Sequence, residues 1–100
     1  MIAFVVTARV AADKTEEWES NWKRNAPIMK ANTGHHFRHL LRSTEDETQY
    51  MIYGLWDSEE QLRAALANSK AQATITAFQE ITTEGPDRVV YELVETDENL

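Results

Sequence analysis

The chain of 100 residues contains no cysteine, which excludes a disulfide framework, an iron–sulfur cluster and a thiolate zinc site. It also lacks a basic run, because ten Lys and Arg stand against seventeen Asp and Glu, for a formal net charge of -7. A nucleic-acid backbone or an anionic membrane would find no place to dock. The apolar first segment, 1–10, is too short to span a bilayer and has no small-residue cleavage site after it. These absences predict a cytoplasmic protein that binds neither nucleic acid nor a membrane.

The short chain predicts a single domain with a thin core. A domain of this length buries only roughly two thirds of the surface that its unfolded chain exposes. The expected strands are apolar on both faces, whereas the expected helices can cover only one face of a sheet. A second copy of the sheet is the economical cover for the other face, so we predict a homodimer joined through its sheets.

Apolar periodicity and punctuation residues divide the chain into alternating strands and helices. Residues 2–10 are β-branched, aromatic and nearly all apolar, as in a strand covered on both faces. Asp13 and Glu16 have the spacing of a capping pair at the start of a helix. Further along this helix, Pro27 removes a backbone hydrogen bond and should kink or restart the helix near Asn25.

The rest of the chain continues the alternation. Asp57 with Glu60 is predicted to cap the second helix, and the segment 68–72 separates it from a third. Gly85 and Pro86 are expected to end that third helix. The other predicted elements are, in order, a helix end at 32–34, strands over 35–43 and 48–56 joined as a hairpin by the acidic loop 44–47, and a last strand over 88–94.

The order strand, helix, strand, strand, helix, helix, strand is the ferredoxin-like split βαβ pattern with one additional short helix. It predicts an α+β domain over residues 1–95, with a four-stranded antiparallel sheet that carries its helices on one face. Residues 96–100 form an acidic tail, which we expect to be disordered.

All three histidines lie within the stretch His35–His39, and their relation depends on the backbone. On a helix, His35 and His39 would share a face one turn apart, whereas on the predicted strand they share a face about 13 Å apart. Nitrogen ligands must each lie about 2.1 Å from a zinc ion, and His36 points to the opposite face of the strand. The strand interpretation therefore predicts no metal site.

The pairing of the two hairpin strands decides which side chains share a face. If Ser43 pairs with Thr48 across the four-residue loop, His39 lies opposite Ile52. Gly54 has no side chain and therefore leaves space for a pocket between the strands. His35 then lies opposite Trp56. The first predicted face holds His35, Phe37, His39, Leu41, Tyr50, Ile52, Gly54 and Trp56. The second predicted face holds His36, Arg38, Leu40, Arg42, Met51, Tyr53 and Leu55.

Three stretches of the chain are informative together: TARVAADKTEEW near the start, LLRSTEDETQYMIYGLWDSEEQLRAAL in the middle and EGPDRVVYELVE near the end. In this order they resemble the antibiotic biosynthesis monooxygenase family, over almost the whole chain. The resemblance implies a dimeric α/β barrel and a monooxygenase that acts without a cofactor on an aromatic, polyketide-like or quinol substrate. Members that oxidise aromatic polyketides have a strand-end tryptophan, which Trp56 matches. Their asparagine four residues earlier and tyrosine six later are replaced here by Ile52 and Leu62.

Oxygenation without a cofactor requires a base that deprotonates an activated phenol or methylene group, and donors that hold the oxyanion. Histidine suits the proton step, because its unperturbed pKa is about 6.5. We predict His39 as the catalytic base, and Trp56 as a catalytic pocket wall and indole donor. The predicted substrate-binding residues are His35 and Tyr50 on the same face, and Arg38 with Tyr53 on the opposite face.

Plainer roles fit the same residues. His35 and His36 can be surface polar groups at the start of a strand, and His39 can satisfy a buried hydrogen bond. Trp18 and Trp22 stand at helical spacing, which indicates core packing. For the function, two alternatives stay open. One is an isomerase or cyclase of the same fold, which would not need oxygen, and the other is a noncatalytic dimer that binds a small ligand.

Overall fold

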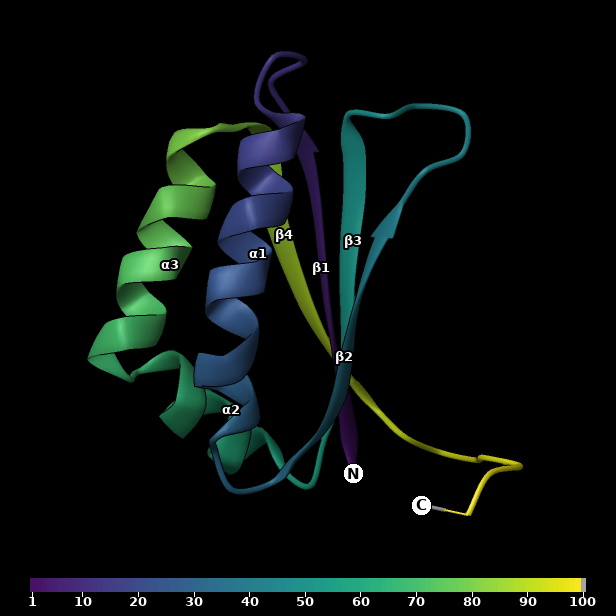
Figure 1. The fold of residues 1–100 in the computed structure, drawn as a ribbon. Coiled ribbons are helices and arrows are strands. Elements are labelled where there is room, and N and C mark those ends of the chain that lie inside the picture. Colours follow the sequence, from purple (N-terminus) through teal and green to yellow (C-terminus); the bar gives the residue numbers. More distant parts are fainter. Residues whose placement is uncertain (100) are drawn as a thin grey trace.

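Three helices and four strands follow one another along the chain in the predicted order: strand, helix, strand, strand, helix, helix, strand (Figure 1). The computed structural model describes residues 1–99. The elements are β1 (Ile2–Val10), α1 (Thr15–Lys30), β2 (His35–Arg42), β3 (Gln49–Trp56), α2 (Glu59–Leu66), α3 (Ser69–Glu80) and β4 (Thr82–Glu92). The strands form one sheet in the order β2-β3-β1-β4, and every neighbouring pair is antiparallel. This arrangement confirms the ferredoxin-like α+β fold.

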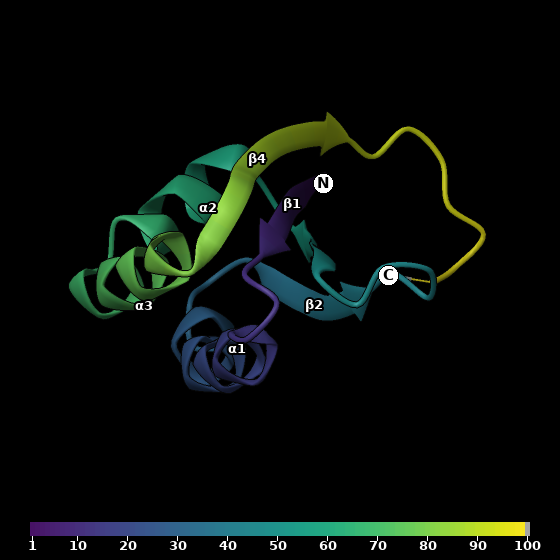
Figure 2. The same ribbon diagram turned by 90° about the horizontal axis from the view of Figure 1, so that it is seen from above.

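The helices all lie on one face of the sheet (Figure 1). Seen from above, α1 lies beside β2, whereas α2 and α3 lie toward β4 (Figure 2). The opposite face of the sheet carries no helix, and we call it the open face. Its exposed large apolar side chains include Leu41, Met51, Val89 and Tyr91.

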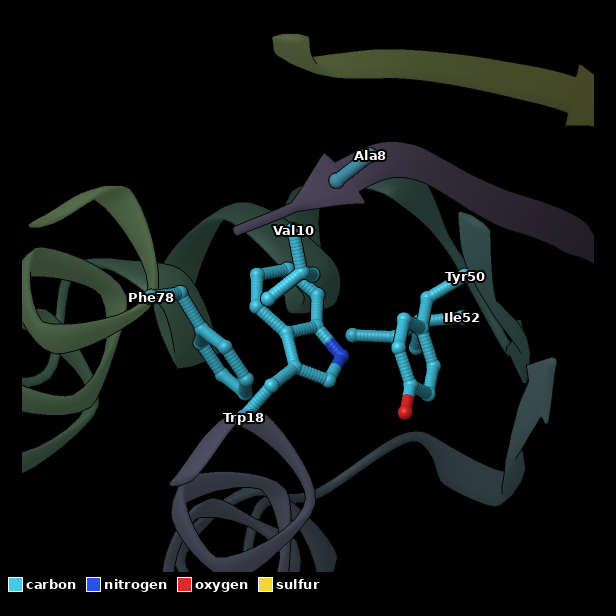
Figure 3. Packing of buried hydrophobic residues seen from close by; sticks show 6 residues of the cluster. All are labelled: Ala8, Val10, Trp18, Tyr50, Ile52 and Phe78. Carbon is cyan, nitrogen blue, oxygen red and sulfur yellow. The ribbon is translucent and has the colours of Figure 1, made fainter. Parts of the chain in front are cut away.

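Two clusters of buried side chains fill the space between the sheet and the helices. In the first, Trp18 of α1 packs against Phe78 of α3 and Tyr50 of β3, with ring centroids 4.5 Å and 5.8 Å from its own (Figure 3). The second surrounds Trp56 of β3 and Leu62 of α2, each of which is 1% exposed. Rings and aliphatic side chains of this size contribute most of the hydrophobic stabilisation of a small core. The two clusters leave a gap between them, in which the candidate site lies.

The helix caps differ from the predicted ones. α1 starts without any side-chain capping bond, so the predicted pair of Asp13 and Glu16 is wrong. α2 is capped by Ser58, whose hydroxyl accepts a hydrogen bond from a backbone N–H at 3.2 Å. The predicted pair of Asp57 and Glu60 is therefore displaced by one residue. Because the serine completes the cap, the Asp57 carboxylate is available for another contact.

Pro27 was predicted to kink or restart the helix near Asn25; the helix does not restart there, because α1 is a single helix as far as Lys30. Two amides tie this part of α1 to α3: Asn21 Nδ2 donates to the Thr74 carbonyl at 2.9 Å, and Asn25 Nδ2 donates to the Thr74 hydroxyl at 2.7 Å. These buried bonds stabilise the packing of α1 against α3. Within residues 1–99, no helix is long and apolar enough to cross a membrane.

The last strand begins at Thr82, well before the predicted start at residue 88. Gly85 and Pro86, expected to mark the end of a helix, lie inside the strand instead. Gly85 has a φ of 84°, and a Cβ atom there would lie 2.9 Å from the Thr7 carbonyl oxygen. The pairing with β1 is irregular after Thr7, as is usual where glycine and proline interrupt an edge strand. The predicted acidic tail extends to Leu100, which lies outside the described residues.

Candidate active site

A bulge in β2 decides which side chains face the helices. The pairing with β3 starts as predicted, with His35 opposite Trp56, and then shifts by one residue, so that Arg38 lies opposite Gly54. The additional residue is His36. Because successive side chains of a strand alternate between faces, one additional residue moves every later side chain of β2 to the other face.

The predicted division of the hairpin into two faces is therefore wrong beyond His35. The face toward the helices holds Arg38, Leu40, Arg42, Tyr50, Ile52, Gly54 and Trp56. The open face holds Phe37, His39, Leu41, Met51, Tyr53 and Leu55. His39 and Trp56, which the sequence analysis places in one site, lie on opposite faces of the sheet. A catalytic role of His39 stays a prediction, but it cannot involve the Trp56 ring of the same chain.

Two contacts to Asp57 hold the bulge. The Asp57 backbone N–H donates to the Gly34 carbonyl at 2.8 Å, and the Asp57 carboxylate Oδ1 lies 2.5 Å from His36 Nε2. Gly34 has a φ of 93°, which favours glycine, and a Cβ atom there would collide with the Gln61 side chain at 2.5 Å. These contacts therefore hold the start of β2 next to the start of α2.

The open face carries an aromatic strip in place of the predicted pocket. His39 is exposed and pairs with Tyr53, and the Phe37 ring lies 4.9 Å from the His39 ring and 5.8 Å from the Tyr53 ring. Within residues 1–99, no three His, Cys, Asp or Glu side chains gather in a way that could hold a metal ion. The strip has the character of a contact surface, since its rings are flat, partly exposed and not enclosed.

A narrow cavity lies on the other side of the sheet, between the two core clusters, with a volume of about 60 Å³. Its wall is mainly apolar and includes Phe4 of β1, Ile52 and Trp56 of β3, and Phe78 of α3. Three polar side chains interrupt this wall: Asn25, Arg38 and Arg88. An apolar wall with a few placed polar groups is characteristic of a small-molecule site, but such sites usually measure about 300–1,000 Å³, so an aromatic ring enters this cavity only when wall side chains move apart.

The Arg38 side chain reaches this cavity by lying over Gly54 on the helix face of the sheet, where a Cβ atom at Gly54 would lie 2.8 Å from Arg38 Cγ. Its guanidinium carbon lies 5.8 Å from the ring centroid of Trp22. Within residues 1–99, Arg38 Nη1 is buried without a hydrogen-bond partner, and no ion pair includes this residue. Burial lowers the pKa of Arg38 to about 10, so the side chain stays protonated at neutral pH. Arg38 is half-buried as a whole and lies near the Trp22 ring, so the cost falls on the one unpaired Nη1 donor. Buried polar groups without a partner concentrate at functional sites.

Two further buried polar atoms of the wall have no partner within residues 1–99: Asn25 Oδ1 and Trp18 Nε1. The Asn25 amide is fixed by its bond to Thr74, and the Trp18 indole nitrogen points toward Ile52 and Tyr50 (Figure 3). From the sequence, Asn25 was expected only as the helix position near which Pro27 acts. Its spacing could have revealed it, because Asn25 stands seven residues after Trp18, two turns along the same helix face.

The remaining predicted residues stand beside the cavity or away from it. The His35 ring meets the Trp56 ring edge-on at 5.2 Å, behind the cavity wall. Burial, followed by the charges of Arg38 and Lys30, lowers the pKa of His35, so this ring is neutral at neutral pH. Tyr50 is buried in the first core cluster and donates its hydroxyl hydrogen bond to a Glu19 carboxylate at 2.6 Å. Of the predicted site, the structure therefore brings Trp56, Arg38 and His35 together.

A sheet with all helices on one face, and an apolar cavity beneath them, defines a ferredoxin-like domain with an internal site. The chain belongs to the antibiotic biosynthesis monooxygenase family, whose family model matches residues 1–77. This membership confirms the resemblance carried by the first two sequence stretches, and the third, at 84–95, lies beyond the matched residues.

Solved structures share the fold at low sequence identity. A candidate antibiotic biosynthesis monooxygenase from Nitrosomonas europaea is 20% identical, with a TM-score of 0.87, over 95% of this chain and 100% of its own. SnoaB, a cofactor-independent oxygenase from Streptomyces nogalater, is 22% identical, with a TM-score of 0.87, over 98% of this chain and 97% of its own. No curated protein matches the chain. At these identities the likeness establishes the fold alone.

The unpaired guanidinium leads to a stability prediction. Replacing Arg38 by methionine keeps a long side chain but removes a half-buried charge and its unpaired Nη1 donor, so Arg38→Met should raise the free energy of unfolding by up to about 1 kcal/mol. Urea unfolding measures this change. Arg42→Met is the matched control, because Arg42 is exposed on the same strand and lies 3.3 Å from a Glu19 carboxylate oxygen, and it should be neutral or slightly destabilising. A clear loss of stability in Arg38→Met would mean that the arginine serves the fold.

Proposed function

We propose that the protein is a small monooxygenase that acts without a cofactor on an aromatic substrate bound in the cavity between the sheet and α1. The observation that carries this proposal is the apolar, tryptophan-lined cavity with the unpaired cation Arg38 in its wall. Family membership supports the reaction class, and the cofactor-independent oxygenase SnoaB has the same fold.

The chemistry requires an electron-rich substrate anion. An activated methylene compound whose enol has lost its proton to the solvent is a carbanion in its other resonance form, and this anion transfers one electron to oxygen and then combines with the superoxide formed. The resulting peroxide takes up a proton and loses water, so that one oxygen atom becomes a new carbonyl and the other leaves in water. The oxygen supplies all the oxidising equivalents, and the protein has to hold the anion in a dry, positively charged place.

Trp56 and Arg38 meet this requirement in the proposed site. The Trp56 indole nitrogen lies 3.5 Å from the point that a Cβ atom at Gly54 would occupy, and Arg38 Cγ lies 2.8 Å from the same point. The indole N–H of Trp56 and the stem of the Arg38 side chain therefore both lie beside Gly54. We assign substrate oxygen binding to these two groups, while Ile52 and Phe78 contact the apolar part of the substrate.

Oxygen uptake with a reactive anthrone or quinol tests the proposed reaction. The wild type should consume oxygen in step with product formation, and Arg38→Gln should lower the rate by on the order of a hundredfold, because the anion loses its partner. Trp56→Phe should be milder, since it keeps the wall and removes only the indole donor. Product formation without oxygen would indicate the isomerase or cyclase instead.

The variant His39→Asn tests the location of the site. If His39 on the open face were the base, its loss would lower the rate by on the order of a hundredfold. The proposed cavity site predicts a much smaller change than in Arg38→Gln, because the His39 side chain lies on the other face of the sheet. A rate in His39→Asn as low as in Arg38→Gln would contradict the cavity as the place of reaction.

The proposal includes a cytoplasmic homodimer of the dimeric α/β barrel type, in which the open faces of two sheets meet. Leu41 of the edge strand β2 is 48% exposed, and Val89 and Tyr91 of the edge strand β4 are 43% and 54% exposed, so the open face presents several large apolar side chains to solvent. His39 and Tyr53 would then belong to the subunit contact. An isologous pairing of this face would cover these side chains and thicken the thin core.

A charged substitution on the open face tests the dimer. Val89→Lys places an ammonium group on the apolar open face that the proposed contact covers, so it should convert a dimer into a monomer or weaken association at least tenfold. Light scattering over a range of concentrations measures the change. Ala64→Lys, at an exposed position of α2 on the helix side, is the matched control and should remain dimeric. A folded wild-type monomer at micromolar concentration would contradict the dimer.

A further inference from the structure

The charged groups of the cavity wall are all of one sign. Among the described residues that line the cavity, Arg38 and Arg88 are cationic, and none is Asp, Glu or His. Arg88 lies on the edge strand and is exposed, so water solvates its charge. Arg38 differs, because its buried Nη1 donor lacks a partner within residues 1–99. The wall therefore offers a fixed positive charge and no acid to neutralise it.

The lining also lacks a group that could take up a proton near neutral pH. His35 is separated from the cavity by the Trp56 ring, which it meets edge-on at 5.2 Å. The one amide acceptor of the wall, Asn25 Oδ1, does not titrate. A neutral substrate that had to be deprotonated inside the cavity would find no base there.

From this asymmetry we infer that the cavity selects its ligand as an anion: an aromatic molecule whose negatively charged oxygen pairs with the Arg38 guanidinium. The inference rests on the proposed function in so far as the ligand is the substrate. It narrows the substrate to aromatic acids, namely carboxylates and phenols or enols acidic enough to be ionised when they enter. An ionised phenol or enol then itself supplies the electron-rich anion that the reaction needs, whereas a carboxylate would serve only to bind the ligand to Arg38.

Gly54 makes this recognition possible. The Arg38 side chain passes over Gly54 so closely that a Cβ atom would lie 2.8 Å from its Cγ, and 3.3 Å from the Phe37 carbonyl oxygen. Any other residue at position 54 would push the guanidinium stem away from the cavity. Gly54→Ala therefore moves the charge of Arg38 without removing it. The variant tests whether ligand binding depends on where the guanidinium lies, and not only on its being present.

Three single-ring probes test the inference by quenching of tryptophan fluorescence, since Trp18 and Trp56 both line the cavity. They are 4-nitrobenzoate, 4-nitrophenol, which ionises close to neutral pH, and the neutral 4-nitrobenzamide. Charge-assisted hydrogen bonds to a buried cation should make each anion bind roughly tenfold to a hundredfold tighter than the amide. The yellow absorbance of the phenolate shows directly whether bound nitrophenol is ionised.

Arg38→Gln should abolish the preference for the anions, and Gly54→Ala should weaken it at least severalfold. Arg42→Gln changes the net charge by the same amount at an exposed position of the same strand and should retain the preference. A preference for the carboxylate alone would assign the site to carboxylic acids, and a preference for the phenolate alone to acidic phenols. Either result supports an anion site.

Equal binding of the amide, an undiminished preference in Arg38→Gln, or no saturable binding of either anion would overturn the inference. The comparison of acid and amide in the wild type needs no variant, so it stands even if a substitution disturbs folding. Because this readout is binding, it is independent of oxygen uptake. Selective binding of anions without turnover would refute the proposed reaction and leave the inference in place. Turnover of neutral substrates without selective binding of anions would refute the inference and leave the proposed reaction in place.

Discussion

The bulge at His36 is the constraint on which the candidate site depends. The contact between His36 and the Asp57 carboxylate joins the start of β2 to the start of α2, and one additional residue there reverses the faces of the rest of the strand. Without the bulge, Arg38 would lie on the open face and His39 would lie beneath the helices. A single unpaired backbone position thus decides whether the cavity contains a cation or an imidazole.

The Arg38 guanidinium beneath the helices occupies a place where a core normally has an apolar side chain. A fold can place an apolar side chain opposite Gly54 at no cost, whereas this one buries an arginine donor without a partner and leaves Asn25 Oδ1 and Trp18 Nε1 unsatisfied as well. Each unmet group costs about 1–3 kcal/mol, a large share of the stability of a domain this small. A bound anion would satisfy the arginine, which explains how such an arrangement can persist.

Long-range features of the fold were predictable from the sequence, because apolar periodicity and strand order depend on many residues at once. The order of elements, the ferredoxin-like class and the pairing of His35 with Trp56 follow from them. The faces beyond His35 were not predictable, because the bulge residue is a histidine with no glycine signal, and a slip of one position has no effect on composition. Asn25 was missed for a different reason: its role comes from the Oδ1 atom left over after its bond to Thr74, which only the packed structure reveals.

The central claim is that small aromatic anions bind under the helices and not on the open face. Titration of isotopically labelled protein with 4-nitrobenzoate, followed by nuclear magnetic resonance of the indole and backbone N–H groups, tests it most directly. The account predicts that the indole signals of Trp18 and Trp56 shift with saturation, while the backbone signals of Met51 and Tyr53 change little. Saturable shifts confined to Met51, Tyr53 and their open-face neighbours, with unchanged indole signals, would contradict it.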